Sequence, residues 1–199
     1  MFPTATYTAR RGQLCKDLGQ GLIFFPGNSE SPVNYAGNVY PFRQDSNFLY
    51  FIGIDQPGLA ATLDAATGEA VLYGNELSLE DIVWTGPLPT LKELAERVGI
   101  TKVRPMSELG EALSGLTPHF TPPYRFDTKI WLSELLWIPV REVKNHVSEA
   151  LIHAIIRQRA YKSAEEIAQI ETAVNISRRM HLAAMTHARA GMTEAELMA

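Results

Sequence analysis

Five histidines are the residues of this sequence best suited to holding a metal ion. They are His119, His146, His153, His181 and His187. His146 and His153 would share a face if one helix ran through both, with Glu142 and Glu149 as nearby carboxylates. A metal site needs further ligands that converge in a cleft, and a solvated helix face explains these charges equally well. For His181, which falls in an apolar stripe, a hydrogen-bonded interface role is favoured over a catalytic one.

The single cysteine, Cys15, precedes Lys16, which could activate its thiol. No motif places a histidine beside it, so an ordinary, partly buried cysteine is the favoured interpretation. One cysteine cannot form an internal disulfide, which is typical of a reducing compartment. The first residues lack a signal peptide, and no stretch approaches the ~20 apolar residues that a membrane span needs. We therefore expect a cytoplasmic protein without a membrane segment.

The common catalytic motifs are absent from these 199 residues. There is no glycine-rich phosphate fingerprint after a strand, no Gly-x-Ser-x-Gly elbow and no His-Glu-x-x-His pair. The formal net charge of −4 supplies no basic field that could gather phosphates, so nucleic-acid binding is not expected. The sequence carries no complete catalytic or metal constellation.

The elements that must position any site alternate between apolar runs and helical patterns, which predicts an α/β fold with a mixed sheet and helices on both faces. Helices are expected over residues 4–18, 91–98 and 107–113. Strands are expected over 21–27, 48–53, 59–64, 69–74 and 101–104. Gly68 can take the positive φ of a tight turn, so 59–74 should be an antiparallel hairpin. The stretches 28–40 and 116–124 are rich in turn formers and should be loops.

The last third of the chain is nearly all helix-forming, with a boundary expected within 159–163. Ser163 and Glu166 have capping-box spacing, so a long helix should begin there and end at Gly191. Its apolar stripe, which requires cover, consists of Ile167, Ile170, Val174, His181 and Met185.

A second capping box, formed by Thr193 and Glu196, comes just before the last residue, Ala199. Isolated helices shorter than ~12–15 residues are marginal in water, and here the helix start signal is followed by hardly any helix. We therefore expect Ala199 to be a truncation point, and the chain to be the front part of a larger enzyme.

The most distinctive segment is Arg43-Gln-Asp-Ser-Asn-Phe-Leu-Tyr-Phe-Ile-Gly53, a polar turn followed by aromatic residues. It has a purely structural interpretation. Asp45 and Asn47 would satisfy backbone groups of the turn and Arg43 would pair with Asp45, while Phe48 and Tyr50 would pack on one face of a sheet.

This segment also resembles the Arg-x-Asn/Asp-Ser-Asp/Asn-Phe-x-Tyr-Leu-Thr-Gly stretch of Xaa-Pro aminopeptidases, in the creatinase and prolidase superfamily; only Phe51 and Ile52 depart from it. Arg159-Ala-Tyr-Lys-Ser-Ala-Glu-Glu-Ile is similar to the Arg-x-x-Lys-Ser-x-x-Glu-Ile segment that opens the catalytic domain of that family. Gly191-Met-Thr-Glu-Ala-Glu-Leu is similar to the start of the next catalytic helix. The matches occur in the family's order and span essentially the whole chain.

The resemblance implies a non-catalytic amino-terminal α/β domain over residues 1–158, followed at 159–199 by the first helices of a truncated pita-bread domain. It also implies a parent enzyme that removes the amino-terminal residue preceding a proline. Such enzymes use two divalent metals, often manganese, held by two Asp, one His and two Glu. None of these ligand positions lies in this chain, so no catalytic or metal residue is assigned to it, and alone it should be inactive.

Residues of this domain are instead candidates for a substrate entrance or an interface. Ile82-Val-Trp-Thr-Gly is similar to the family's Trp-x-Gly loop, which makes Trp84 and Gly86 candidates beside Arg43, Asp45 and Asn47. The basic residue usual after that loop is replaced by Pro87-Leu-Pro, and a buried structural role for Trp84 is an equal alternative.

The partners implied by the resemblance are the chain's own catalytic domain, further copies in a dimer or tetramer and, for the parent, peptides with proline second. Two rival functions stay open. One is a non-enzymatic binding or scaffold protein of the same fold, and the other is a prolidase- or creatinase-like hydrolase.

Overall fold

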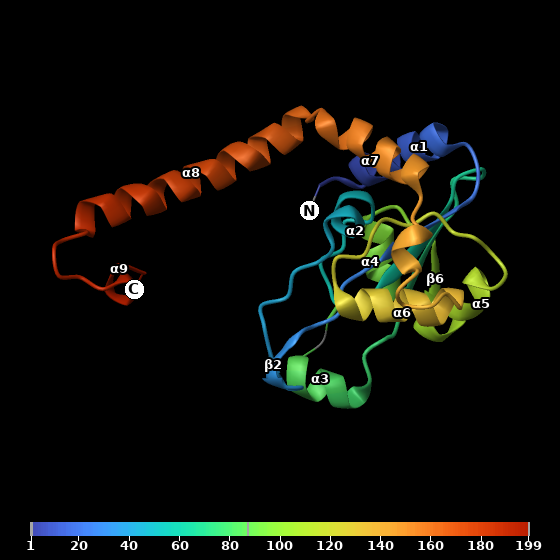
Figure 1. Ribbon diagram of the computed structural model, residues 1–199, viewed down its shortest axis with the longest axis horizontal. Helices are drawn as coiled ribbons and strands as arrows, with labels where there is room; N and C mark the ends of the chain where they lie inside the picture. Colours follow the sequence, from blue (N-terminus) through green and yellow to red (C-terminus); the bar gives the residue numbers. More distant parts are fainter. Residues whose placement is uncertain (1, 87, 199) are drawn as a thin grey trace. The chain divides into compact units, whose positions relative to one another are not determined.

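The chain forms two compact units, Met1–Gln158 (unit 1) and Arg159–Ala199 (unit 2), in a computed structural model that describes residues 2–86 and 88–198 (Figure 1). Ala199, the expected truncation point, lies outside the described residues. The assignment of the two units as a non-catalytic domain and the start of a catalytic domain stays a prediction.

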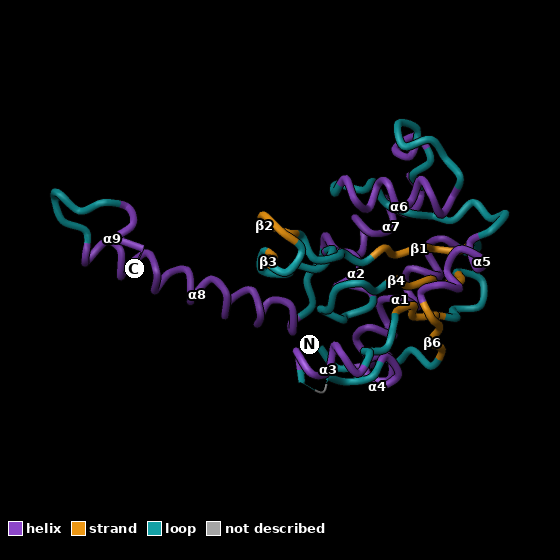
Figure 2. The backbone as a smooth tube through the Cα atoms, turned by 90° about the horizontal axis from the view of Figure 1, so that it is seen from below, coloured by secondary structure: helices purple, strands orange, loops and turns teal. Residues whose placement is uncertain are grey.

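A four-stranded mixed sheet forms the centre of unit 1, as predicted (Figure 2). Its order is β1 (Leu22–Pro26), β4 (Ala60–Asp64), β5 (Ala70–Gly74) and β6 (Lys102–Pro105). β4 is antiparallel to β1 and β5, and β5 is parallel to β6, so β1, β5 and β6 end at the same edge. The predicted hairpin is confirmed, and Gly68 has a φ of 75° in its turn.

Helices pack on both faces of the sheet because side chains of a strand alternate between faces. Ile23 and Phe25 of β1 belong to one core and Phe24 to the other. The first core includes side chains of α1 (Thr4–Leu18), α2 (Ser46–Phe51), α4 (Leu91–Arg97) and α7 (Glu149–Ala160). The second includes side chains of α5 (Leu109–Leu113), α6 (Phe126–Leu136) and the 3-10 turn η2 (Val143–Asn145). Met106 of the 3-10 turn η1 (Met106–Glu108) packs against this second core. Among the side chains that the structure describes, helix α3 (Leu79–Thr85) adds none to either core.

The aromatic strand predicted over 48–53 is wrong, because Ser46–Phe51 is the helix α2. The Asp45 carboxylate accepts hydrogen bonds from the backbone N–H of Asn47 (2.8 Å) and Phe48 (2.9 Å), which starts a helix. Phe48 and Phe51, three residues apart, are then buried on one helical face. The buried aromatic residues therefore follow the spacing of a helix and not that of a strand, and Phe48 and Tyr50 do not share a sheet face.

The loop predicted over 28–40 is also partly wrong. Pro32–Tyr35 (β2) and Asn38–Val39 (β3) form a small antiparallel hairpin of their own. The 116–124 stretch is a loop, as predicted, but its His119 adds an isolated parallel bridge to Ile23 of β1. Short pairings of this kind depend on which backbone groups tertiary packing brings together, and no local pattern marks them.

A buried arginine joins three helices on the first face of the sheet. Arg11 of α1 is only 4% exposed. Its guanidinium donates to the carbonyl oxygens of Phe51 (3.0 Å), Val98 (2.7 Å) and Gly99 (3.2 Å), at the carboxyl ends of α2 and α4. Burial lowers the pKa of Arg11 to about 10. Because the carboxyl ends of helices carry partial negative charge, these carbonyls compensate a buried cation that pairs with no carboxylate among the described residues.

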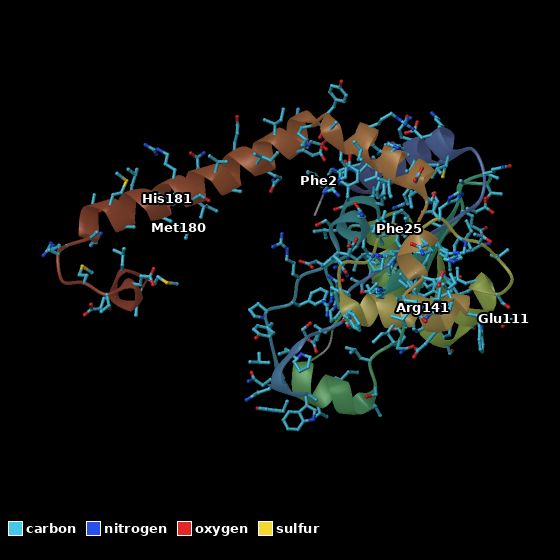
Figure 3. All side chains as sticks on the ribbon, in the orientation of Figure 1. Phe2, Phe25, Glu111, Arg141, Met180 and His181 are labelled. Atoms are coloured by element: carbon cyan, nitrogen blue, oxygen red, sulfur yellow. The ribbon has the colours of Figure 1, made fainter. Side chains whose placement is uncertain are left out.

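Unit 2 contains α8 (Ala164–His187) and α9 (Glu194–Met198). The predicted capping box at Ser163 is confirmed: its hydroxyl accepts from the Glu166 N–H (3.2 Å), and the Glu166 carboxylate accepts from the Ser163 N–H (2.8 Å). No side chain of α8 is buried; Figure 3 shows Met180 and His181 standing out from the helix. Among the described helices, none is long and apolar enough to cross a membrane.

Candidate functional site

Three of the predicted site residues, Arg43, Asp45 and Asn47, lie in the turn that leads into α2. The Asp45 carboxylate caps this turn by accepting hydrogen bonds from backbone N–H groups. The Asn47 side-chain amide also donates a hydrogen bond of 3.5 Å to the Thr121 hydroxyl in a neighbouring loop. The predicted Arg43–Asp45 ion pair does not form within the part of the chain that the structure describes. The Asp45 carboxylate acts on the backbone instead, and the Arg43 side chain is exposed.

The side chains of two buried amide residues, Asn28 and Gln44, form hydrogen bonds with the backbone of this turn. The Asn28 side chain donates to the Arg43 carbonyl (2.8 Å) and to the Tyr124 hydroxyl (2.9 Å). The Gln44 carbonyl oxygen accepts from the backbone N–H of Asn28 (2.7 Å) and Asp45 (2.9 Å). Sequence reasoning missed both residues. The available signal was Asn28, a polar residue directly after the apolar run 21–27, although such a residue is equally typical of a turn.

Asp45 and Asn47 line the same hollow, of about 260 Å³, beside α7. Its other lining residues are Thr121, Pro122, Tyr124, Ile152, Ile155 and Ile156. The hollow combines a carboxylate, an amide and hydroxyls with an apolar wall. An apolar wall with a few polar groups is the usual composition of a binding site.

Arg43 lines a neighbouring hollow of about 230 Å³ together with Arg125. Arg125 is fixed by the Ser29 carbonyl (3.0 Å), the Ser31 hydroxyl (2.6 Å) and both carboxylate oxygens of Asp127 (3.1 and 2.6 Å). Burial acts to raise the pKa of Asp127, but hydrogen bonds from Arg125, the Thr128 N–H and Ser29 outweigh it and lower that pKa. Asp127 is therefore a charged partner that neutralises Arg125.

Trp84 and Gly86, the other two predicted site residues, line neither of these two hollows. The expected Trp-x-Gly loop is the end of α3, where Trp84 is 84% exposed and Gly86 follows with a φ of 75°. The alternative of a buried structural tryptophan is wrong. Leu79 and Val83 of the same helix are similarly exposed, which gives α3 an apolar surface. Pro87, in the segment that replaces the usual basic residue, lies outside the described residues.

The histidines and Cys15 do not form a reactive site. His146 follows η2 and precedes α7, so no single helix runs through both His146 and His153 and the condition for a shared helical face is not met. His119 instead lies 2.7 Å from the Ser148 hydroxyl through its Nδ1. Burial, and then the nearby charge of Asp64, raise the pKa of the Cys15 thiol, which opposes thiolate formation.

Two divalent metals do not fit the residues present. Among the side chains that the structure describes, no group of three or more His, Cys, Asp or Glu residues could hold a metal ion. No catalytic step can therefore be derived from a metal bound to these residues.

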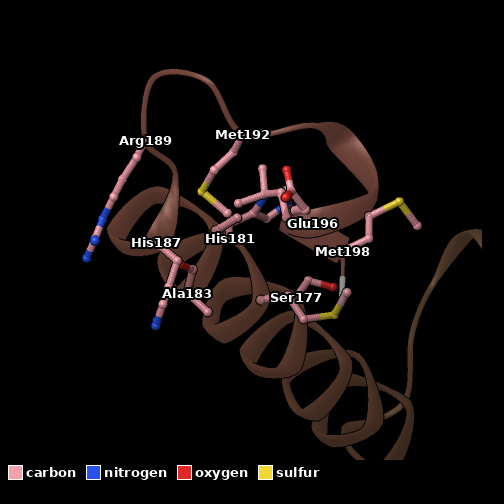
Figure 4. A pocket seen from close by; sticks show the side chains of 11 residues that line it. Ser177, His181, Ala183, His187, Arg189, Met192, Glu196 and Met198 are labelled. Carbon is pink, nitrogen blue, oxygen red and sulfur yellow. The ribbon is translucent and has the colours of Figure 1, made fainter.

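His181 lines the largest of these hollows, of about 870 Å³, which lies within unit 2 between α8 and α9 (Figure 4). Met180, Met192 and Met198 give it an apolar lining, and Figure 4 shows Met192 and Met198 on the side of α9. Glu196 is engaged by the Thr193 N–H (2.8 Å) and hydroxyl (2.9 Å), which is the second predicted capping box. The hollow is a gap between helices, without paired reactive groups.

A family model described as "Aminopeptidase P, N-terminal domain" matches residues 7–120, more than half of the chain. The chain therefore belongs to the aminopeptidase P amino-terminal domain family. The resemblance noted for the 43–53 segment is thus confirmed at the level of the family.

Curated relatives carry the name "Probable Xaa-Pro aminopeptidase PEPP". The Pyricularia oryzae protein is 28% identical over 179 residues, which are 90% of this chain and 38% of the relative. The Uncinocarpus reesii protein is 26% identical over 205 residues, which are 100% of this chain and 42% of the relative. This chain thus spans well under half the length of these relatives.

Solved structures share the fold. Aminopeptidase P from E. coli, in its low-pH form, superimposes with a TM-score of 0.79 at 23% identity, over 100% of this chain and 48% of that one. Proline aminopeptidase P II from Yersinia pestis gives 0.80 at 23% identity, over 99% and 48%. The predicted mixed sheet with flanking helices is confirmed by this likeness.

Proposed function

We propose that this chain is the amino-terminal domain, with the beginning of the catalytic domain, of an Xaa-Pro aminopeptidase. The complete enzyme would hydrolyse the bond between an amino-terminal residue and a following proline. The family match over residues 7–120 carries this proposal, and the names of the curated relatives support it. In this proposal, residues 1–158 are non-catalytic and 159–199 begin the metal-bearing domain.

The role of unit 1 is assembly and control of substrate access. An exposed tryptophan on the apolar surface of α3 supports this role, because large exposed apolar side chains mark interaction surfaces. The complete enzyme works as a homo-oligomer in the cytoplasm and uses two divalent metals, with manganese preferred. In this proposal, its metal ligands come from sequence beyond this chain.

The test compares the complete protein with the 199-residue chain in an assay of Xaa-Pro peptides, with and without Mn²⁺. The complete protein should show metal-dependent turnover, and the chain alone should show none. Turnover by the chain alone would contradict the placement of the ligands. A complete protein without activity would instead favour the scaffold function.

The entrance role of Trp84 is tested in the complete protein by Trp84→Ala. If Trp84 narrows the entrance, this variant should raise kcat/KM for long peptides relative to dipeptides by several-fold, because its effect acts on access and not on the reacting bond. Trp137→Ala is the matched control, since Trp137 is 92% exposed and is not assigned to the entrance. An equal effect of both variants on long and short peptides would argue against the role.

A further inference from the structure

A hollow of about 420 Å³ opens at the edge of the sheet in unit 1 where three strands end. β1, β5 and β6 run in the same direction, and the residues directly after them, Gly27, Asn75 and Met106, all line it. In open, mostly parallel α/β sheets, ligands bind beyond the carboxyl ends of the strands. This mixed sheet presents three such ends at one edge, with the antiparallel β4 between β1 and β5. The volume also falls within the ~300–1,000 Å³ usual for small-molecule sites. Position and size thus both fit a ligand site.

Helix α6 supplies the apolar wall of this hollow. Trp131 and Thr128, three residues apart on α6, both line it. The Trp131 ring packs edge-to-face on Phe24 of β1, with the ring centroids 5.8 Å apart, which restricts its orientation. Leu59 and Met106 add further apolar surface. A flat ring could pack against this wall without moving it.

Glycines keep the base of the hollow open. A Cβ at Gly27 would lie 2.4 Å from the Leu59 carbonyl oxygen, so only glycine permits this close approach of the two backbones. A Cβ at Gly58 would meet no atom within 4 Å. The hollow is therefore bounded at this point by backbone and not filled by side chains.

Two polar groups of the hollow lack partners. In the part of the chain that the structure describes, the Thr128 hydroxyl and the Asn75 amide nitrogen make no hydrogen bond. The Asn75 carbonyl oxygen accepts only a long bond, 3.4 Å, from the Met106 N–H. Asp127, by contrast, is fully engaged by Arg125, the Thr128 N–H (2.8 Å) and the Ser29 hydroxyl (3.0 Å). The free groups are neutral, and the one carboxylate is already neutralised.

We propose that this hollow binds a small, uncharged molecule with a flat ring and an amide-like group. The ring packs on Trp131, and the polar group hydrogen-bonds to the Thr128 hydroxyl and the Asn75 amide. This binding site goes beyond the proposed peptidase function. It does not depend on that function, because the site includes neither the turn before α2 nor the apolar surface of α3.

Benzamide, added to the 199-residue chain, is the probe that tests this site. The chain has three tryptophans, so Trp84→Phe and Trp137→Phe leave Trp131 as the only one. We expect a saturable change in Trp131 emission, with backbone amide NMR shifts concentrated at Asn75 and Thr128. Benzoate and benzylamine should bind more weakly, since the site offers no uncompensated charge.

Removal of one hydroxyl should locate the site. Thr128→Val keeps the side-chain shape and should weaken benzamide binding about three- to tenfold, the loss of one hydrogen bond. Thr8→Val makes the same change on α1, outside the hollow, and should leave binding unchanged. Asn75→Ser, at an exposed position, gives a second variant if Thr128→Val does not fold. Absence of saturable binding, equal effects of the Thr128 and Thr8 variants, or tighter binding of a charged probe would each overturn the proposal.

Discussion

Asp45 is the single residue with the clearest local effect, since its carboxylate holds two backbone N–H groups at the start of α2. We predict that Asp45→Ala lowers the free energy of unfolding by about 1 kcal/mol, the usual effect of losing a helix cap. Urea denaturation followed by circular dichroism measures this. Asp45→Asn, which keeps a capping oxygen, should lose less; an equal loss in both variants would show that capping is not the cause.

Asp127 is a residue whose contribution should depend on pH. Its pKa lies below the ordinary value of 3.8, so the stability it supplies is present above that value and is lost as the pH falls through the folded-state pKa. At neutral pH, Asp127→Asn should lower the free energy of unfolding by about 0.5 kcal/mol. The effect is small because solvent screens the Arg125–Asp127 pair, in which Asp127 is about half exposed.

Unfolding experiments at a series of pH values measure the free energy of unfolding of the wild-type chain and of Asp127→Asn. The difference between the two should shrink toward zero in acid. Asp55→Asn serves as the matched control for removing one exposed carboxylate. A difference for Asp127→Asn that stays constant down to pH 2 would contradict the assignment of a charged Asp127.

At the level of elements, two glycines end helices with the same backbone angle but different surroundings. Gly19 follows α1 and Gly53 follows α2, each with a φ of 79°. A Cβ at Gly53 would lie 2.3 Å from the Tyr7 ring, whereas a Cβ at Gly19 would meet nothing within 4 Å. The pair therefore separates backbone strain from crowding between α1 and α2.

We predict that Gly19→Ala costs about 1 kcal/mol of stability through the left-handed backbone alone. Gly53→Ala should cost a further 1–3 kcal/mol or so, because Tyr7 must move within a packed core. Thermal and urea unfolding of both variants provide the comparison. Equal losses of unfolding free energy in the two variants would mean that Tyr7 of α1 can move away from a Cβ at position 53 without cost, and would contradict tight packing between α1 and α2.

At the level of the whole molecule, the apolar stripe of α8 is exposed over most of its length in the residues that the structure describes. Val174 is 58% exposed and Met185 76% exposed. We predict that the 199-residue chain associates with itself at high concentration through this stripe. Val174→Glu with Met185→Glu should shift light scattering toward a monomer. Gln169→Glu with Thr172→Glu, which add the same charge on the opposite side of the helix, should not; a wild-type chain that stays monomeric would refute the prediction.

Much of the fold was predictable because its signals are local. Gly68 in a turn between two apolar runs predicted the hairpin, and the spacing of Ser163 and Glu166 predicted the start of α8. The α2 segment was mispredicted since aromatic residues favour strands, although the pair Phe48 and Phe51 has helical spacing. The capping role of Asp45 decided between the two, and a capping residue outweighs a weak β-propensity.

The candidate site was predictable only in part. Asp45 and Asn47 do line one hollow, but its opposite wall comes from Ile152 and Ile155, about a hundred residues later in the chain. The sequence alone determined which residues could cap, turn or be buried, because those preferences act over a few residues. Only the tertiary structure decided what lies beside them: the carbonyls that surround Arg11, the exposure of Trp84, and the strand ends that meet around Trp131. Contacts between distant segments depend on packing of the whole unit, which no local pattern specifies.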